Sequence, residues 1–278
     1  MMFRRKEKTG IHGNNLEFYR AFHSREFTVA LIIGAALSIY QAVMRYVYYK
    51  TYMGMSYSGI TIWTQTLFNE AVITPSSALM RFLAPFLVCL PHGLSYWRDM
   101  RQGYGKNLLT REKRSQYLKD KWLAAVGSGI TILYIPYSLN FLLCGLFLPI
   151  TNAEVLCRQQ GLHPHAFLAR LFYENTFLYA AFYFALFALF AAVCVTFALA
   201  LSTFAEYWFS CLFGPFLVCL VLYNVASITS IPMVAPFYFL DPNQPNIFPP
   251  IPVIGSLLAA VVIFGCFYYG RGMKNDVF

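Results

Sequence analysis

Charged residues are scarce in this chain. Only 12% of its 278 residues are Asp, Glu, Lys or Arg, whereas a soluble protein contains about 25%. Hydrophobic residues make up 58% of the chain and include 27 Phe and 20 Tyr. A soluble domain of this length cannot bury so much apolar surface, which excludes the ordinary soluble class. The composition predicts an all-α integral membrane protein that crosses the bilayer several times.

Several chemical motifs are also missing. The chain has no Gly-x-x-x-x-Gly-Lys-Ser/Thr loop for nucleotides, no His-Glu-x-x-His zinc motif and no Gly-x-Ser-x-Gly elbow. Its seven cysteines include no Cys-x-x-Cys pair, so we expect neither a disulfide framework nor a metal site. The apolar runs lack paired acids, which disfavours proton-driven transport. The chain is therefore expected to be no enzyme and to hold no cofactor itself.

The N-terminal residues lack the marks of a cleaved leader. Residues 1–26 contain no apolar core region and no small-residue cleavage site, so we expect no cleavable signal peptide. Residues 16–27 have the pattern of an interfacial amphipathic helix. On that helix we expect Leu16, Phe18, Tyr19, Phe22 and Phe27 to lie on lipid. We expect the polar side to face water, with Glu17, Arg20, His23 and Arg25.

Six apolar runs follow, each close to the roughly 20 residues that a helix needs to cross a bilayer. They are residues 28–48, 78–97, 122–147, 174–202, 210–230 and 253–270. Pro85 and Pro91 predict a bend in the second run. The sequence thus divides into a tail with its interfacial helix (1–27), a six-helix transmembrane domain (28–270) and a second tail (271–278).

The most polar stretch between the first and last runs is the segment 98–121. It carries eight Lys/Arg against three acids. The two ends and this segment together hold sixteen Lys/Arg, whereas the opposite loops hold three, or four with Arg81. The positive-inside rule then places both termini and the segment in the cytoplasm of a multi-pass plasma (inner) membrane protein.

This basic segment has two interpretations. Gly103 permits a tight turn, and a helical pattern follows from Leu108 to Leu118. The segment can therefore form a helical bar that lies across the membrane face and receives the movement of a soluble partner. The alternative is a solvated basic loop that only sets the topology.

Here the chain resembles the permease subunits of ABC-2 type exporters. The matching residues are Asp99, Gly103, Leu108-Leu109-Thr110-Arg111, Arg114, Tyr117 and Lys121. Two departures are Asp99, where that family often has Glu, and Gly103-Tyr104 in place of Gly-Thr. The resemblance implies a type V exporter-like fold: an N-terminal interfacial helix, six transmembrane helices and a cytoplasmic coupling helix between helices 2 and 3.

The resemblance also implies partners. Separate ABC ATPase subunits would bind ATP and Mg, and a second copy or a related permease would complete the complex. The residues implied to contact the ATPase are Asp99, Gly103, Leu108, Arg111, Arg114 and Tyr117. We expect contact with membrane lipid and none with nucleic acid.

The cargo is expected to be amphipathic or hydrophobic, such as a peptide, a lipid-like molecule or a drug. Candidates for its path are Arg45, Phe184, Phe187 and Asn224. Arg45 either binds an anionic group or extends to the interface, and Asn224 equally suits a bond between helices. Arg81 is expected to anchor at the interface or to pair with Glu70 or Glu174. The alternative functions are a membrane scaffold or immunity protein that transports nothing, and an integral-membrane enzyme acting on lipid.

Overall fold

The computed structural model describes residues 13–52, 63–64, 75–103, 113–147, 162, 165–242, 246 and 248–274, and these form helices without a strand. The helices are α1 (Gly13–Phe22), α2 (Arg25–Tyr52), α4 (Pro75–Cys89), α5 (Ser95–Arg101), α7 (Arg114–Phe147), α8 (Ala169–Glu174), α9 (Thr176–Ser202), α10 (Trp208–Thr229), η1 (Pro232–Val234), α11 (Pro236–Phe239) and α12 (Pro250–Lys274). The prediction of an all-α chain is confirmed for this part of the sequence.

Five of these helices are long and apolar enough to cross a membrane, namely α2, α7, α9, α10 and α12. They confirm a multi-pass membrane protein. The expected second crossing, residues 78–97, is not one helix. Its helix α4 has 15 residues, fewer than the roughly 20 that a straight crossing needs. The structure therefore differs from six spans of similar length.

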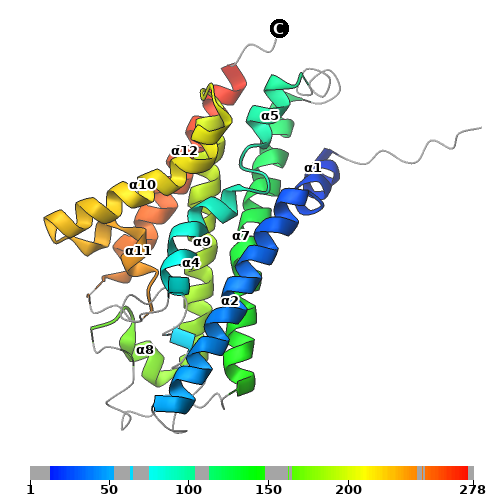
Figure 1. The fold of residues 1–278 in the computed structure, drawn as a ribbon. Coiled ribbons are helices and arrows are strands. Elements are labelled where there is room, and N and C mark those ends of the chain that lie inside the picture. Colours follow the sequence, from blue (N-terminus) through cyan, green and yellow to red (C-terminus); the bar gives the residue numbers. More distant parts are fainter. Residues whose placement is uncertain are drawn as a thin grey trace, which may run out of the picture.

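The second run breaks where a proline enters it. Helix α4 continues through Pro85 but ends at Cys89, two residues before Pro91. In the turn that follows, the N–H of Gly93 donates to the carbonyl of Cys89 at 2.9 Å. A Cβ on Gly93 would lie 2.5 Å from that carbonyl oxygen, so only glycine fits the turn. The predicted bend is confirmed at Pro91, and α5 leaves the turn in a new direction (Figure 1).

Helix α9 lies at the centre of the bundle. It packs against α7, α12, α10, α4 and α8. Its inner faces bury large aromatic side chains, and the ring of Phe187 stacks on Tyr137 of α7 at 4.1 Å. Figure 1 shows α1, α5 and the last turns of α12 at one end of the bundle and α8 at the other, with α10 leaning away from the long helices. We call the first of these ends the α5 end.

Helix α7 begins earlier than hydropathy predicts. It runs without interruption from Arg114 to Phe147, so residues 114–121 are the first turns of a membrane helix and not part of a separate bar. The expected start at residue 122 was wrong because Tyr117 and Lys121 are buried against other segments. Within the expected coupling segment 98–121, the first residues belong to the end of α5, and residues 104–112, including Leu108 and Arg111, lie outside the described residues.

Candidate functional site

The segment predicted as one helix over residues 16–27 forms α1 over Gly13–Phe22 and the first turn of α2 from Arg25, and α1 carries a buried acid. Glu17 is 2% exposed, which contradicts the expectation that it faces water. Glu17 accepts a hydrogen bond from Arg20 at 2.8 Å, one turn later on the same helix. The apolar residues of α1 cover α7, where Phe18 and Phe22 lie over Gly127. Helix α1 therefore packs both apolar and acidic side chains against the bundle.

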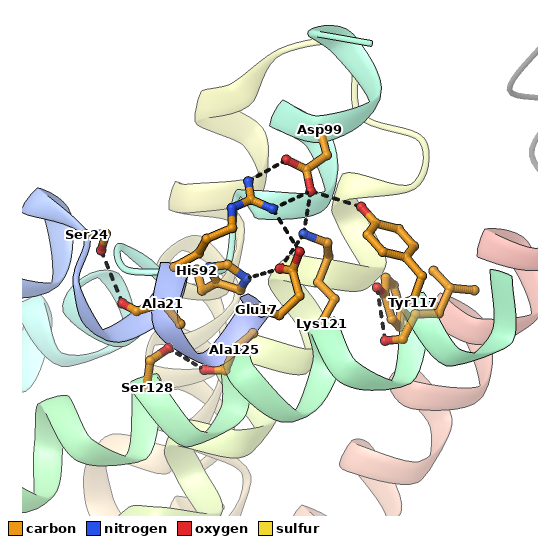
Figure 2. Close-up of polar contacts among 12 residues, drawn as sticks. Glu17, Ala21, Ser24, His92, Asp99, Tyr117, Lys121, Ala125 and Ser128 are labelled. Atoms are coloured by element: carbon orange, nitrogen blue, oxygen red, sulfur yellow. Dashed lines mark hydrogen bonds and ion pairs between the residues drawn. The ribbon is translucent and has the colours of Figure 1, made fainter. Parts of the chain in front are cut away.

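Three further segments supply partners for these two residues, as Figure 2 shows. Lys121 of α7 is fully buried and donates to Asp99 of α5 at 2.6 Å and to Glu17 at 3.1 Å. Arg20 donates to both carboxylate oxygens of Asp99, at 2.8 and 3.3 Å. We call Glu17, Arg20, His92, Asp99, Tyr117 and Lys121 the ionic cluster.

Two uncharged groups complete the ionic cluster. The hydroxyl of Tyr117 donates to Asp99 at 3.0 Å. His92, in the turn after α4, lies 3.0 Å from Glu17 through Nε2. Burial lowers the pKa of His92 to about 4, an effect that Lys121 adds to and Glu17 opposes. His92 is therefore neutral at pH 7 and donates its Nε2–H to Glu17.

The carboxylates of the cluster stay ionised. Burial alone would raise the pKa of Glu17, but the hydrogen bond from His92 and the charges of Lys121 and Arg20 hold that pKa well below its usual range. Burial would likewise raise the pKa of Asp99, and Lys121 and Arg20 lower it. Two anions thus face two cations, and the cluster is neutral overall. Such a balanced, fully bonded set is the condition under which buried charges are tolerated.

The expected ATPase-contact residues fall into three places. Asp99 and Tyr117 are each 1% exposed and face the ionic cluster. Gly103 follows the C-terminus of α5 with φ +73, a left-handed cap that glycine adopts without strain, and the rest of the predicted turn lies outside the described residues. Arg114 is half-buried at the start of α7. Leu108 and Arg111 lie outside the described residues.

The sequence did not predict Glu17, Arg20 or His92 as site residues, and it placed Lys121 only among the residues that match the family motif. The partner of His92, Glu17, is 75 residues away in the sequence, so no local pattern could point to the pair. One signal was present in the sequence. Glu17 and Arg20 are an opposite-charge pair on a helix face next to large apolar residues, and such a pair suits burial as well as solvation.

A second polar group of residues lies deeper in the bundle. Arg81 of α4 forms an ion pair with Asp241 at 3.6 Å, and both side chains are buried. Among the described residues Asp241 is the acid that pairs with Arg81, so the expected pairing of Arg81 with Glu174 is wrong. Asn140 of α7 donates to the carbonyl of Ser38 on α2 at 2.9 Å. One turn further along α2, Gln41 is 2% exposed, and neither of its amide atoms has a hydrogen-bond partner among the described residues.

An apolar pocket of about 460 Å³ lies between α9, α10, η1, α11 and α12. Its walls include Phe190, Phe197, Pro215, Leu222, Met233 and Phe264. Of the described residues that line it, Ser256 is the one with a polar side chain, and its hydroxyl donates to the carbonyl of Val253 at 2.9 Å. The pocket therefore offers contact area for hydrocarbon and almost no hydrogen bonding.

None of the four expected cargo-path residues lines this apolar pocket. Phe187 is stacked in the core between α7 and α9, and Phe184 packs against Trp63. Arg45 is buried on α2. Asn224 is exposed on α10 and donates to the carbonyl of Leu220 on its own helix at 2.8 Å, so it makes no bond between helices there.

The described residues contain no group of three or more His, Cys, Asp or Glu arranged to hold a metal ion.

Comparison with known proteins adds no identity. A scan of protein families and searches of curated proteins and of solved structures find no match to this chain.

Proposed function

We propose that this chain is the transmembrane subunit of an ATP-driven exporter, similar to the ABC-2 permeases, and that it moves an amphipathic or hydrophobic cargo. The observation that carries the proposal is the ionic cluster, which joins α1, the turn after α4, α5 and the base of α7 (Figure 2). Separate ATPase subunits, which bind ATP and Mg, would dock on the α5 end of the bundle, in the cytoplasm with both termini.

The cluster suits the transmission of force from such subunits. Lys121 is bonded directly to Asp99, so a displacement of α5 reaches α7 without an intervening flexible link. Helix α7 has 34 residues and is therefore about 50 Å long. In this proposal Asp99 and Tyr117 position α5 against α7. Gly103 and Arg114 meet the ATPase, together with Leu108 and Arg111 of the segment outside the described residues.

The apolar pocket supports the proposed class of cargo. Its volume of about 460 Å³ falls within the roughly 300–1,000 Å³ of small-molecule sites, and its walls suit hydrocarbon rather than a sugar or an ion. The layout that we propose counts α4 as a sixth, shortened membrane helix that ends before Pro91, and leaves the following turn and α5 at the cytoplasmic surface. A second copy of the chain or a related permease would complete the path.

The test is co-purification from the native membrane, followed by assays of ATP hydrolysis and cargo movement in vesicles. We expect an ATPase to co-purify and its hydrolysis to depend on this chain. Arg114→Ala should lower the stimulated hydrolysis about tenfold, because a charge-assisted hydrogen bond is worth about 1.5–3 kcal/mol. The matched control is Lys113→Ala, which removes the neighbouring exposed cation and should leave hydrolysis unchanged.

Two outcomes would reject the exporter. If no nucleotide-hydrolysing subunit co-purifies and vesicles containing the native complex move no apolar dye, the chain is no exporter subunit. If an ATPase binds and hydrolyses ATP but no amphipathic or hydrophobic compound crosses the membrane, the non-transporting scaffold becomes the better description.

A further inference from the structure

A second concave site lies on the side of the bundle, between α7 and α12. It encloses about 500 Å³, and we call it the lipid groove. Its α7 wall consists of Leu118, Lys119 and Trp122. Its α12 wall consists of Val261, Val262, Gly265, Cys266, Tyr268 and Tyr269. It shares no lining residue with the apolar pocket.

The groove forms where α7 and α12 separate, next to the level at which they are in direct contact. At the contact, the hydroxyl of Tyr268 reaches the carbonyl of Leu118 at 3.5 Å, and a Cβ on Gly272 would lie 2.9 Å from the Leu118 side chain. Two turns back on α12, Gly265 has no side chain to fill the space. The walls are fixed as well, because the indole N–H of Trp122 donates to Thr196 of α9 at 3.0 Å.

The lining of the groove combines hydrocarbon with one cation. The Trp122 N–H and the Tyr268 hydroxyl are bonded to the protein, which leaves the Lys119 ammonium as the charged group of the walls. Lys119 is exposed and lies in the second turn of α7, at the α5 end of the bundle (Figure 1). Tyr269 lies near the same level of α12 and is 41% exposed.

We propose that the lipid groove binds one anionic phospholipid from the surrounding bilayer, with an acyl chain between α7 and α12 and its phosphate-bearing head group on Lys119. The argument is charge complementarity at the right depth. Basic pockets between transmembrane helices near a membrane surface bind acidic head groups, and Trp and Tyr favour the same level. The proposal requires only a membrane-spanning chain and does not depend on transport.

The test uses Trp122 as an internal probe. The protein is reconstituted into phosphatidylcholine vesicles that contain increasing mole fractions of brominated phosphatidylglycerol or brominated phosphatidylcholine. Bromine quenches tryptophan fluorescence on contact, and the difference between wild type and Trp122→Phe isolates the signal of Trp122. Half-quenching should need about fivefold less of the anionic lipid, since one Lys near the surface contributes roughly that preference.

Two kinds of substitution test the contact with the lipid head group and the contact with the acyl chain separately. Lys119→Gln should equalise the two lipids, whereas Lys113→Gln, an exposed lysine outside the groove, should preserve the preference. Gly265→Leu should reduce quenching by both lipids, because its side chain fills the groove. The new Cβ meets only Thr196, at 3.9 Å. Val262→Trp blocks the same space from an exposed position if Gly265→Leu does not fold.

Each contrary outcome overturns part of the proposal. Equal quenching of Trp122 by the two lipids in the wild type refutes the anionic head group. Unchanged quenching in both groove-filling variants refutes an acyl chain in the groove. No quenching of Trp122 by either lipid shows that another part of the complex covers the groove.

Discussion

At the scale of single residues, the ionic cluster determines how tightly α1, α5 and α7 are held. Lys121 is fully buried and bonds both acids of the cluster. Lys121→Met keeps the length of the side chain but leaves Asp99 and Glu17 with less positive charge. We expect a loss of about 3 kcal/mol of stability, the usual result of removing one partner from a buried ion pair. Thermal unfolding in detergent measures it.

The control for this change is Lys113→Met, which removes an exposed lysine one residue before α7. It should alter stability by no more than about 0.5 kcal/mol. Equal effects of the two substitutions would mean that the ionic cluster does not stabilise the fold.

The neutral state of His92 makes stability depend on pH. The pKa of His92 is about 4 in the fold, whereas that of an unfolded histidine is about 6.5. Between these values only the unfolded chain binds the proton, so stability is full above pH 6.5 and declines as the pH falls. From pH 7.5 to 4.5 the expected loss is about 2–3 kcal/mol.

The measurement is thermal unfolding at several pH values, with His92→Gln as the comparison. Glutamine keeps a donor for Glu17 and does not titrate, so the variant should lose most of the dependence between pH 6.5 and 4.5. A variant with the full dependence of the wild type would assign the effect to other groups.

At Gln41 we expect a substitution to raise the stability of the protein. Within the described part of the chain the buried amide of Gln41 has no hydrogen-bond partner on either atom, and such an orphaned group costs about 1–3 kcal/mol. Gln41→Leu removes the polar atoms and roughly keeps the volume, so it should raise the unfolding temperature. Gln102→Leu, which changes an exposed glutamine, should not. A destabilised Gln41→Leu would show that the amide is satisfied in the folded protein.

At the scale of the helices, glycine sets how closely α7 approaches its neighbours. A Cβ on Gly129 would lie 2.5 Å from Val195 Cγ2 on α9 and 3.1 Å from the carbonyl oxygen of Val88 on α4. Gly129→Ala should therefore force three helices apart and cost about 1–3 kcal/mol.

The matched change is Gly255→Ala on α12, where a Cβ meets nothing within 4 Å. There alanine should be neutral or stabilise the helix by up to about 1 kcal/mol. Comparing the two unfolding temperatures tests the packing. If both variants unfold at the temperature of the wild type, the three helices do not pack as closely as the structure indicates.

Hydropathy located the long helices, and it placed both ends of α9 and α10 to within two residues, but it missed the start of α7 and the break after α4. It placed the start of α7 at residue 122 because Lys121 and its polar neighbours resemble a loop, although α1 buries them. It joined 78–97 into one span because the run stays apolar across Pro91. The partners of Arg81 and His92 lie 160 and 75 residues away in sequence, and no local pattern encodes such pairs.

At the scale of the whole molecule, the arrangement places sequence positions at two opposite ends of the helix bundle. Lys113 and Lys274 lie at the α5 end, and Arg170 of α8 lies at the other (Figure 1). In a background with Cys157 and Cys266 changed to Ala, we expect Lys113→Cys and Lys274→Cys to be protected from an impermeant maleimide in intact cells. Arg170→Cys should react.

The remaining described cysteines are buried and should contribute little background. Permeabilised cells provide the control, in which all three positions should react. Labelling of position 113 from outside would reverse the orientation and remove the ATPase from the proposed function.

The ionic cluster also constrains how the chain is made. Lys121 follows Glu17 by 104 residues, so the ribosome completes α1, α2, α4 and α5 before the main cation of the cluster exists. Until α7 is inserted, the acids Glu17 and Asp99 have only Arg20 to neutralise them. Helix α1 therefore cannot complete its contacts with the bundle before α7 is present, because both its packing surface and its buried cationic partner belong to that later helix.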